Sequence, residues 1–157
     1  MKVLVTGNKG YIGSVLCSEL LNQGFEVVGL DTDFYSNCEF FHANTTSIKQ
    51  IVKDVRKITK YDIQGIDAII HLAALSNDPM GELNPKLTQE INCLASINLA
   101  RIAKENKVKR FIFSSSCSLY GKSGKDAINE NGKLDPLTEY AKSKVNTEKE
   151  VARLADN

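Results

Sequence analysis

Short apolar runs alternate along the chain with stretches whose apolar residues recur at helical spacing. The runs read as buried strands and cover residues 2–6, 25–30, 48–55, 68–73 and 111–115. The helical spacing covers residues 11–22 and 85–106, and a last helix is expected from about 137 to the C-terminus. Strands that alternate with helices predict a parallel sheet with helices on both faces, a doubly wound α/β architecture.

The length and charge of the chain fit one compact domain without an electrostatic partner. A chain of 157 residues suits a single domain, here residues 1–157, with one well-buried core. Twenty Lys and Arg residues against 19 Asp and Glu residues give a net charge of +1. This balance gives no reason to expect binding to nucleic acid or to an anionic membrane.

The cysteines and the apolar stretches indicate a soluble cytoplasmic protein. The four cysteines form no CxxC pair and have no histidine at metal-ligand spacing, so neither a disulfide framework nor a metal site is expected. The first apolar run is too short for the core of a signal peptide. The most apolar stretch, 68–75, contains His71 and is too short to span a bilayer.

A glycine-rich turn separates the first expected strand from the first expected helix. Gly7, Gly10 and Gly13 occur in the segment TGNKGYIG at 6–13. A dinucleotide pyrophosphate binds to backbone amides at a helix N-terminus, where side chains would obstruct it. A glycine triplet alone often marks only a turn, but here a strand precedes it and a helix follows it.

Asp31, at the end of the second expected strand, indicates which dinucleotide is bound. Its carboxylate can accept hydrogen bonds from the adenosine ribose hydroxyls of NAD. The additional phosphate of NADP would be repelled there, and no Arg or Lys occurs between Asp31 and Ser47 to compensate. NAD is therefore expected as the cofactor, and the alternative reading of Asp31 is a simple turn or capping residue.

Tyr140 and Lys144 are four residues apart in the last expected helix and so share one face. Tyrosine, with an ordinary pKa near 10, is a poor base at neutral pH. A nearby ammonium and a positive nicotinamide ring would lower the pKa of Tyr140 and favour the phenolate. Such a pair is common by chance. Its position downstream of a glycine turn and a serine-ended strand makes it a candidate catalytic pair.

Taken together, these motifs resemble those of the extended short-chain dehydrogenase/reductases, in particular the NAD-dependent epimerase/dehydratase family. The matching segments follow the family's order over nearly the whole chain: TGNKGYIG at 6–13, Asp31, Asp54-Val55-Arg56, HLAA at 71–74, Asn92, FIFSSSCSLYG at 111–121 and YAKSK at 140–144. The resemblance implies a Rossmann-type sheet with strand order 3-2-1-4-5.

The resemblance also implies roles for individual residues. Ser116, Tyr140 and Lys144 would form the catalytic group, and Lys144 would also bind the nicotinamide ribose. The implied cofactor-binding residues are Gly7, Gly10, Tyr11, Ile12, Gly13, Asp31, Asp54, Val55, Leu72, Ala73, Ala74, Tyr140 and Lys144. Asp54 and Val55 would meet the adenine, and Ala73 and Ala74 would contact the cofactor through their backbone. His71 and Asn92 are expected to be structural.

The implied reaction is transient hydride transfer on a nucleotide-sugar such as a UDP- or dTDP-sugar. Dehydratases of the family carry an acidic residue directly after the catalytic serine, whereas this chain has Cys117 and Ser118 there. An epimerase similar to UDP-glucose 4-epimerase is therefore favoured over a 4,6-dehydratase or a reductase.

Family members are roughly twice as long, so the chain is expected to be an N-terminal portion that stops before the substrate domain. A non-catalytic NAD-binding module, or a half-enzyme completed by a second chain, remains an alternative. In the family the long helix and the Tyr–Lys helix commonly pair between subunits. A homodimer is therefore expected, with Val145, Val151 and Leu154 either in that contact or in the core.

Overall fold

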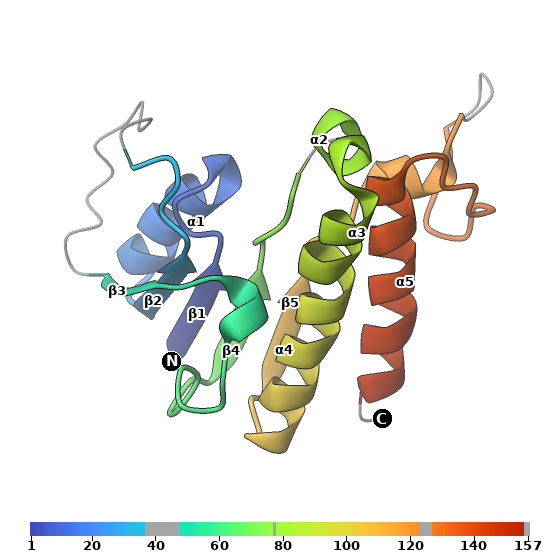
Figure 1. The fold of residues 1–157 in the computed structure, drawn as a ribbon. Helices are drawn as coiled ribbons and strands as arrows, with labels where there is room; N and C mark the ends of the chain where they lie inside the picture. Colours follow the sequence, from blue (N-terminus) through green and yellow to red (C-terminus); the bar gives the residue numbers. More distant parts are fainter. Residues whose placement is uncertain (37–47, 77, 123–126, 156–157) are drawn as a thin grey trace. The chain divides into compact units, whose positions relative to one another are not determined.

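The computed structural model of the protein describes residues 1–36, 48–76, 78–122 and 127–155. The chain falls into two compact units. The first unit comprises residues 1–74 and 98–114, and the second comprises residues 75–97 and 115–157. Each unit is described by itself below, with the elements labelled as in Figure 1.

A five-stranded parallel sheet forms the centre of the first unit. Its strand order is β3-β2-β1-β4-β5, which confirms the expected topology. The strands are β1 (Lys2–Thr6), β2 (Glu26–Asp31), β3 (Lys49–Val52), β4 (Ala68–His71) and β5 (Arg110–Phe113). In the register, Thr6 lies beside Leu30 of β2 and His71 of β4, so the carboxyl ends of the three central strands lie together.

Both faces of this sheet are covered, as the continuous apolar runs predicted. Val3 and Val5 of β1 belong to a core cluster with Cys17 of helix α1 (Tyr11–Asn22). Leu4 of β1 and its neighbour Ile69 of β4 point to the opposite face of the sheet, and both are fully buried. His71 is 1% exposed, and its ring centre lies 6.1 Å from that of Phe111 and 6.0 Å from that of Phe113, which confirms that it is a packed residue.

The expected helix over 85–106 consists of three consecutive segments. They are α3 (Pro85–Thr88), the π-helix η2 (Gln89–Leu94) and α4 (Ala95–Glu105). Asn84 caps the N-terminus of α3 by accepting a hydrogen bond from the Leu87 amide at 3.0 Å. Within the π-helix, the Asn92 carbonyl accepts hydrogen bonds from the hydroxyls of Ser96 and Thr147. The wider turn thus supplies an acceptor to side chains.

The second unit contains two further helices, α2 (Asp78–Leu83) and α5 (Glu139–Leu154). Thr138 begins α5, because its hydroxyl accepts a hydrogen bond from the Ala141 amide at 3.1 Å. Short 3-10 helices, η1 (Val55–Lys57) and η3 (Cys117–Tyr120), follow β3 and β5 along the chain. No helix in the described part of the chain is both long and apolar enough to cross a membrane.

Candidate active site

The glycine turn between β1 and α1 has almost no space for side chains. A Cβ on Gly13 would lie 2.1 Å from the Gly7 carbonyl oxygen, and one on Gly7 would lie 2.8 Å from the Ala73 nitrogen. Gly7 also has a φ of +72°, a conformation that L-residues rarely adopt. Gly13 is therefore required for lack of space, and Gly7 is required both for lack of space and for its positive φ.

The N-terminus of α1 is a bare set of backbone amides. Gly10 is its N-cap, with no side-chain cap and no acidic residue in the first turn. The first amides of any α-helix lack partners within the helix, and the helix dipole makes this end positive. Tyr11 and Ile12 have side chains that are 94% and 60% exposed, so they leave these amides uncovered. This arrangement suits a pyrophosphate.

Asp31 lies beside the glycine turn at the carboxyl end of β2. One of its carboxylate oxygens accepts a hydrogen bond from the Lys9 amide at 3.1 Å, and the other accepts one from the Asp33 amide at 3.0 Å. A carboxylate offers about four lone-pair positions. Asp31 can therefore still accept hydrogen bonds from the two hydroxyls of a ribose.

The remaining predicted cofactor residues of the first unit follow β3 and β4. Val55 is buried, and Asp54 caps η1 through the Arg56 amide at 2.9 Å. A hydrogen bond from the Arg56 side chain is the largest influence on Asp54 and lowers the pKa of its carboxyl. Leu72 continues the β4 pairing through its amide to the Thr6 carbonyl, and the Ala73 amide bonds the Thr6 hydroxyl.

A partly buried pair of amide side chains supports the glycine turn and was not anticipated from the sequence. The Asn8 side chain donates to Gln50 of β3 at 2.8 Å and accepts from it at 3.2 Å. The contact depends on Gly29 of β2, where a Cβ would lie 2.3 Å from the Asn8 amide nitrogen. A glycine inside a buried strand is the signal that could have indicated this close approach.

In the second unit, Ser116 and Tyr140 lie within hydrogen-bonding reach of each other. Ser116 is the N-cap of η3, where its hydroxyl accepts from the Ser118 amide at 3.2 Å and donates to the Ser118 hydroxyl at 3.1 Å. Burial raises the pKa of Tyr140, the hydrogen bond with Ser116 lowers it, and the charge of Asp78 raises it again. The pKa of Tyr140 is thus raised in the protein without cofactor, because burial dominates, and the lowering by a positive nicotinamide ring stays a prediction.

Lys144 lies one turn further along α5 and is only 4% exposed. Its ammonium nitrogen lies over the Tyr140 ring, 5.6 Å from the ring centre. Burial lowers the pKa of Lys144 to about 8, and Glu148 opposes this shift. Ser116, Tyr140 and Lys144 are therefore brought together, as the sequence predicted.

Helix α2 holds the first turn of α5 and was also missed. Asp78 accepts a hydrogen bond from the Thr138 hydroxyl at 2.6 Å, and Glu82 accepts one from the Glu139 amide at 2.7 Å. Gly81 permits the close approach, because a Cβ there would lie 3.3 Å from the Tyr140 Cβ. Carboxylates at a helix N-terminus are favourable. They fix the turn that carries Tyr140.

Asn92 is structural, as expected. Its side chain accepts a hydrogen bond from the Leu75 amide at 2.8 Å and donates one to the Leu75 carbonyl at 3.0 Å. The segment that follows β4 is therefore attached to η2. Because the glycine turn belongs to the first unit and the Tyr–Lys pair to the second, their meeting around one cofactor stays a prediction.

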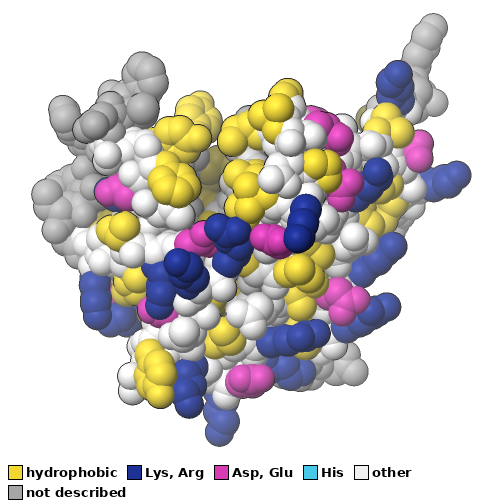
Figure 2. Space-filling view, viewed as in Figure 1, with side chains coloured by type: hydrophobic (Ala, Val, Ile, Leu, Met, Phe, Trp, Pro, Cys, Tyr) yellow, Lys and Arg dark blue, Asp and Glu magenta, His cyan; other side chains and the backbone are white. Residues whose placement is uncertain are grey.

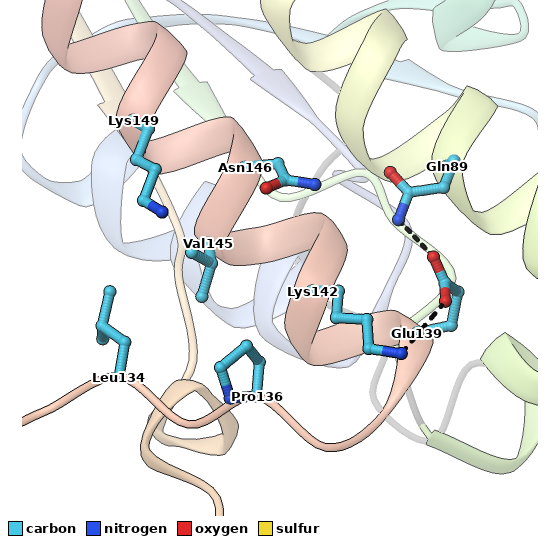
Figure 3. Close-up of a pocket in the computed structure, with 8 residues that line it drawn as sticks. All are labelled: Gln89, Leu134, Pro136, Glu139, Lys142, Val145, Asn146 and Lys149. Atoms are coloured by element: carbon cyan, nitrogen blue, oxygen red, sulfur yellow. Dashed lines mark hydrogen bonds and ion pairs between the residues drawn. The ribbon is translucent and has the colours of Figure 1, made fainter.

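A pocket lies along the same stretch of α5, lined by Glu139, Lys142, Val145, Asn146 and Lys149. Figure 3 shows Leu134 and Pro136 of the preceding loop facing this helix, with a chain of polar contacts from Gln89 through Glu139 to Lys142. Ser116, Tyr140 and Lys144 do not line it. In the described part of the chain, no group of three His, Cys, Asp or Glu residues could hold a metal ion.

The comparisons with known proteins agree with this geometry. The model of the NAD dependent epimerase/dehydratase family matches residues 3–157. The UDP-glucose 4-epimerase GEPI42 of Cyamopsis tetragonoloba is 32% identical, over 96% of this chain and 46% of that protein. The chain thus spans about half the length of such curated relatives.

Two solved structures extend the comparison to three dimensions. The UDP-glucose-4-epimerase from Stenotrophomonas maltophila, with bound NAD and formylated UDP-arabinopyranose, has a TM-score of 0.86 and 31% identity over 99% of this chain and 48% of that one. The dTDP-glucose 4,6-dehydratase from Streptomyces venezuelae, with NAD bound, has a TM-score of 0.84 and 26% identity, over 98% of this chain and 51% of that one.

Proposed function

Because the chain belongs to the NAD dependent epimerase/dehydratase family, we propose that it is the NAD-binding part of a nucleotide-sugar epimerase similar to UDP-glucose 4-epimerase. The observation that carries this proposal is the grouping of Ser116, Tyr140 and Lys144 around the start of α5. A non-catalytic NAD-binding module would not need these three side chains together.

The first unit fits the adenosine and pyrophosphate of NAD. The bare amides of α1 would hold the pyrophosphate, and Gly7 and Gly13 would let the turn pack closely enough to present these amides. Asp31 would accept the ribose hydroxyls, and Asp54 and Val55 would meet the adenine. Leu72, Ala73 and Ala74 follow β4 at the same sheet edge and would line the cofactor.

The second unit supplies the proton chemistry. Tyr140 as phenolate would take the proton from a sugar hydroxyl, and Ser116 would hydrogen-bond the same oxygen. Lys144 would bind the nicotinamide ribose and, when charged, would favour the phenolate. NAD supplies the hydride acceptor and donor. The raised pKa of Tyr140 implies that the phenolate becomes favourable only when positive charge is added nearby.

The residues after Ser116 favour an epimerase over a dehydratase. Neither Cys117 nor Ser118 has the carboxylic acid that a dehydratase needs to eliminate water. Cys117 is an exposed thiol, and the Ser118 hydroxyl accepts a hydrogen bond from Ser116. Asp78 is the carboxylate that influences Tyr140, but it is bound to the Thr138 hydroxyl as part of the support for α5. An oxidised sugar would therefore receive its hydride back without loss of water.

The UDP- or dTDP-sugar substrate, the assembly and the location are part of the same proposal. Pairing of two copies through α4 and α5 would make a homodimer; Val145 is 4% exposed and belongs to the core, which leaves the outer residues of α5 for the contact. Acidic and basic side chains are interspersed on the face drawn in Figure 2, in accord with the near-zero net charge.

The proposed location is the cytoplasm. The thiols of Cys17, Cys93 and Cys117 form no disulfide, which suits a reducing compartment.

The test is product analysis by proton NMR with the protein at its natural length. UDP-glucose and NAD should give UDP-galactose with no 4-keto-6-deoxy sugar. Tyr140→Phe should abolish the conversion but preserve NAD binding in calorimetric titration. A 4-keto-6-deoxy product would show a dehydratase, and absence of NAD binding by the unaltered protein would overturn the proposal.

A further inference from the structure

Three charged side chains meet where β2 ends beside the glycine turn. Lys9 comes from that turn, Asp31 is the last residue of β2, and Asp33 follows two residues later. The Lys9 amide bonds the Asp31 carboxylate, while the Lys9 ammonium reaches past it to Asp33 at 2.7 Å. Lys9 precedes Asp31 in the sequence and so lies outside the stretch 31–47, whose lack of Lys and Arg favours NAD.

The position of Asp33 is determined by its backbone. Asp33 has a φ of +61°, and its amide donates to the Asp31 carboxylate at 3.0 Å in a tight turn. Aspartate and asparagine are the non-glycine residues that tolerate this left-handed conformation best. The turn places the Asp33 carboxylate against Lys9, with the two side chains 25% and 27% exposed.

We propose that the Lys9–Asp33 ion pair is a second determinant of cofactor choice, in which Asp33 occupies a cation that could otherwise bind a phosphate on the adenosine ribose. This inference rests on the proposed NAD site. With Lys9 paired to Asp33, the additional phosphate of NADP meets an uncompensated Asp31 carboxylate. Once Asp33 is neutral, the Lys9 ammonium can turn to a phosphate at the Asp31 position.

A purely structural role would give a different result. Partly exposed ion pairs contribute little to folding, so loss of this pair should have little effect on stability. The charges act on an anionic ligand instead, where removing a like charge or releasing a cation changes affinity by roughly tenfold or more. Cofactor discrimination is therefore the property that separates the two roles.

The experiment is a set of calorimetric titrations with NAD and NADP. Asp33→Asn keeps the size of the side chain and its tolerance of positive φ, so the turn is expected to survive. Relative to the unaltered protein, Asp31→Asn and Asp33→Asn should each tighten NADP binding by roughly tenfold, and the double variant by roughly a hundredfold. Adding Lys9→Met to the double variant should weaken its NADP binding again, by the roughly tenfold that Asp33→Asn contributed.

Two results would overturn the inference while leaving the proposed function in place. One is equal NADP affinity of the double variant with and without Lys9→Met, since Lys9 would then play no part. The other is NADP binding that Asp33→Asn does not tighten, in a protein that binds NAD normally. Failure of the unaltered protein to bind NAD would instead overturn the proposed function itself, and the inference with it.

Discussion

The ammonium nitrogen of Lys144 lies 5.6 Å from the centre of the Tyr140 ring, one helical turn away on α5. The lysine is 4% exposed, and burial lowers its pKa to about 8. Burial also raises the pKa of Tyr140. At neutral pH Lys144 therefore stays mostly charged in spite of its lowered pKa, whereas Tyr140 stays neutral, so the phenolate needs further positive charge nearby.

Replacing Lys144 by methionine should stabilise the protein at neutral pH, because a buried charge is removed. A pKa lowered from 10.5 to about 8 corresponds to roughly 3 kcal/mol. Between pH 8 and 10.5 the unfolded chain keeps the proton that the folded protein has released, so the unaltered protein gains stability from Lys144 as the pH rises through this window. The advantage of Lys144→Met should therefore shrink over the same range.

Urea denaturation at a series of pH values measures this effect. Lys142→Met is the matched control on the same helix, because the Lys142 side chain is 51% exposed. The control should change stability by less than about 0.5 kcal/mol at every pH. A Lys144→Met protein that is less stable than the unaltered one at pH 7, or whose advantage does not vary with pH, would contradict the assignment.

Alanine at Gly13 should disrupt both the fold of the glycine turn and NAD binding. The added Cβ would meet the Gly7 carbonyl at 2.1 Å, and backbone must move, at a cost of about 1–3 kcal/mol. Gly24→Ala is the control: Gly24 has a φ of +78° but nothing within 4 Å of an added Cβ. It should cost about 1 kcal/mol through strain alone and leave the NAD affinity unchanged. Equal loss of NAD affinity in both variants would show that the turn is not the binding element.

Asn92→Ala should destabilise the second unit by about 1–3 kcal/mol, because it leaves the Leu75 amide and carbonyl without their side-chain partner. Asn146→Ala, at an exposed position of α5, serves as the control and should be close to neutral. Thermal denaturation measures both variants. Matching melting temperatures would mean that the Leu75 groups find other partners.

Alkylation by iodoacetamide should distinguish the cysteines. Burial raises the pKa of Cys17 to about 11 and also raises that of Cys93, so neither forms the reactive thiolate readily. Cys117 is exposed and should be labelled in the folded protein well before these two. Peptide mass mapping before and after denaturation gives the order. Early labelling of Cys17 would show that the core opens locally.

Much of the fold could be predicted because periodicity and glycine placement are local signals. The helix expected over 11–22 is α1 (Tyr11–Asn22), and the predicted strand order is confirmed. The third strand was expected over 48–55 but ends at Val52, because Asp54 caps η1 instead. Residues 48–55 contain enough apolar side chains to look like one strand. Periodicity alone therefore did not reveal that Asp54 ends the strand region by capping η1.

The grouping of Ser116, Tyr140 and Lys144 could also be predicted, whereas its supports could not. Tyr140 and Lys144 have a fixed helical spacing. By contrast, α2 contains Pro79 and Gly81, which argue against a helix, and it is held by contacts with α5 more than 50 residues away in the sequence. The pairs Asn8–Gln50 and Lys9–Asp33 likewise depend on chain folding, since no spacing rule relates their members.

We expect one NAD molecule to extend from the glycine turn to the Tyr–Lys pair. Intermolecular NOEs measured on isotope-labelled protein saturated with NAD test it most directly. We expect contacts from the nicotinamide ring protons to the Tyr140 ring, and from the adenine H2 or H8 protons to the Val55 methyl groups. NAD that binds with adenine contacts alone, or with nicotinamide contacts to other residues only, would contradict the account.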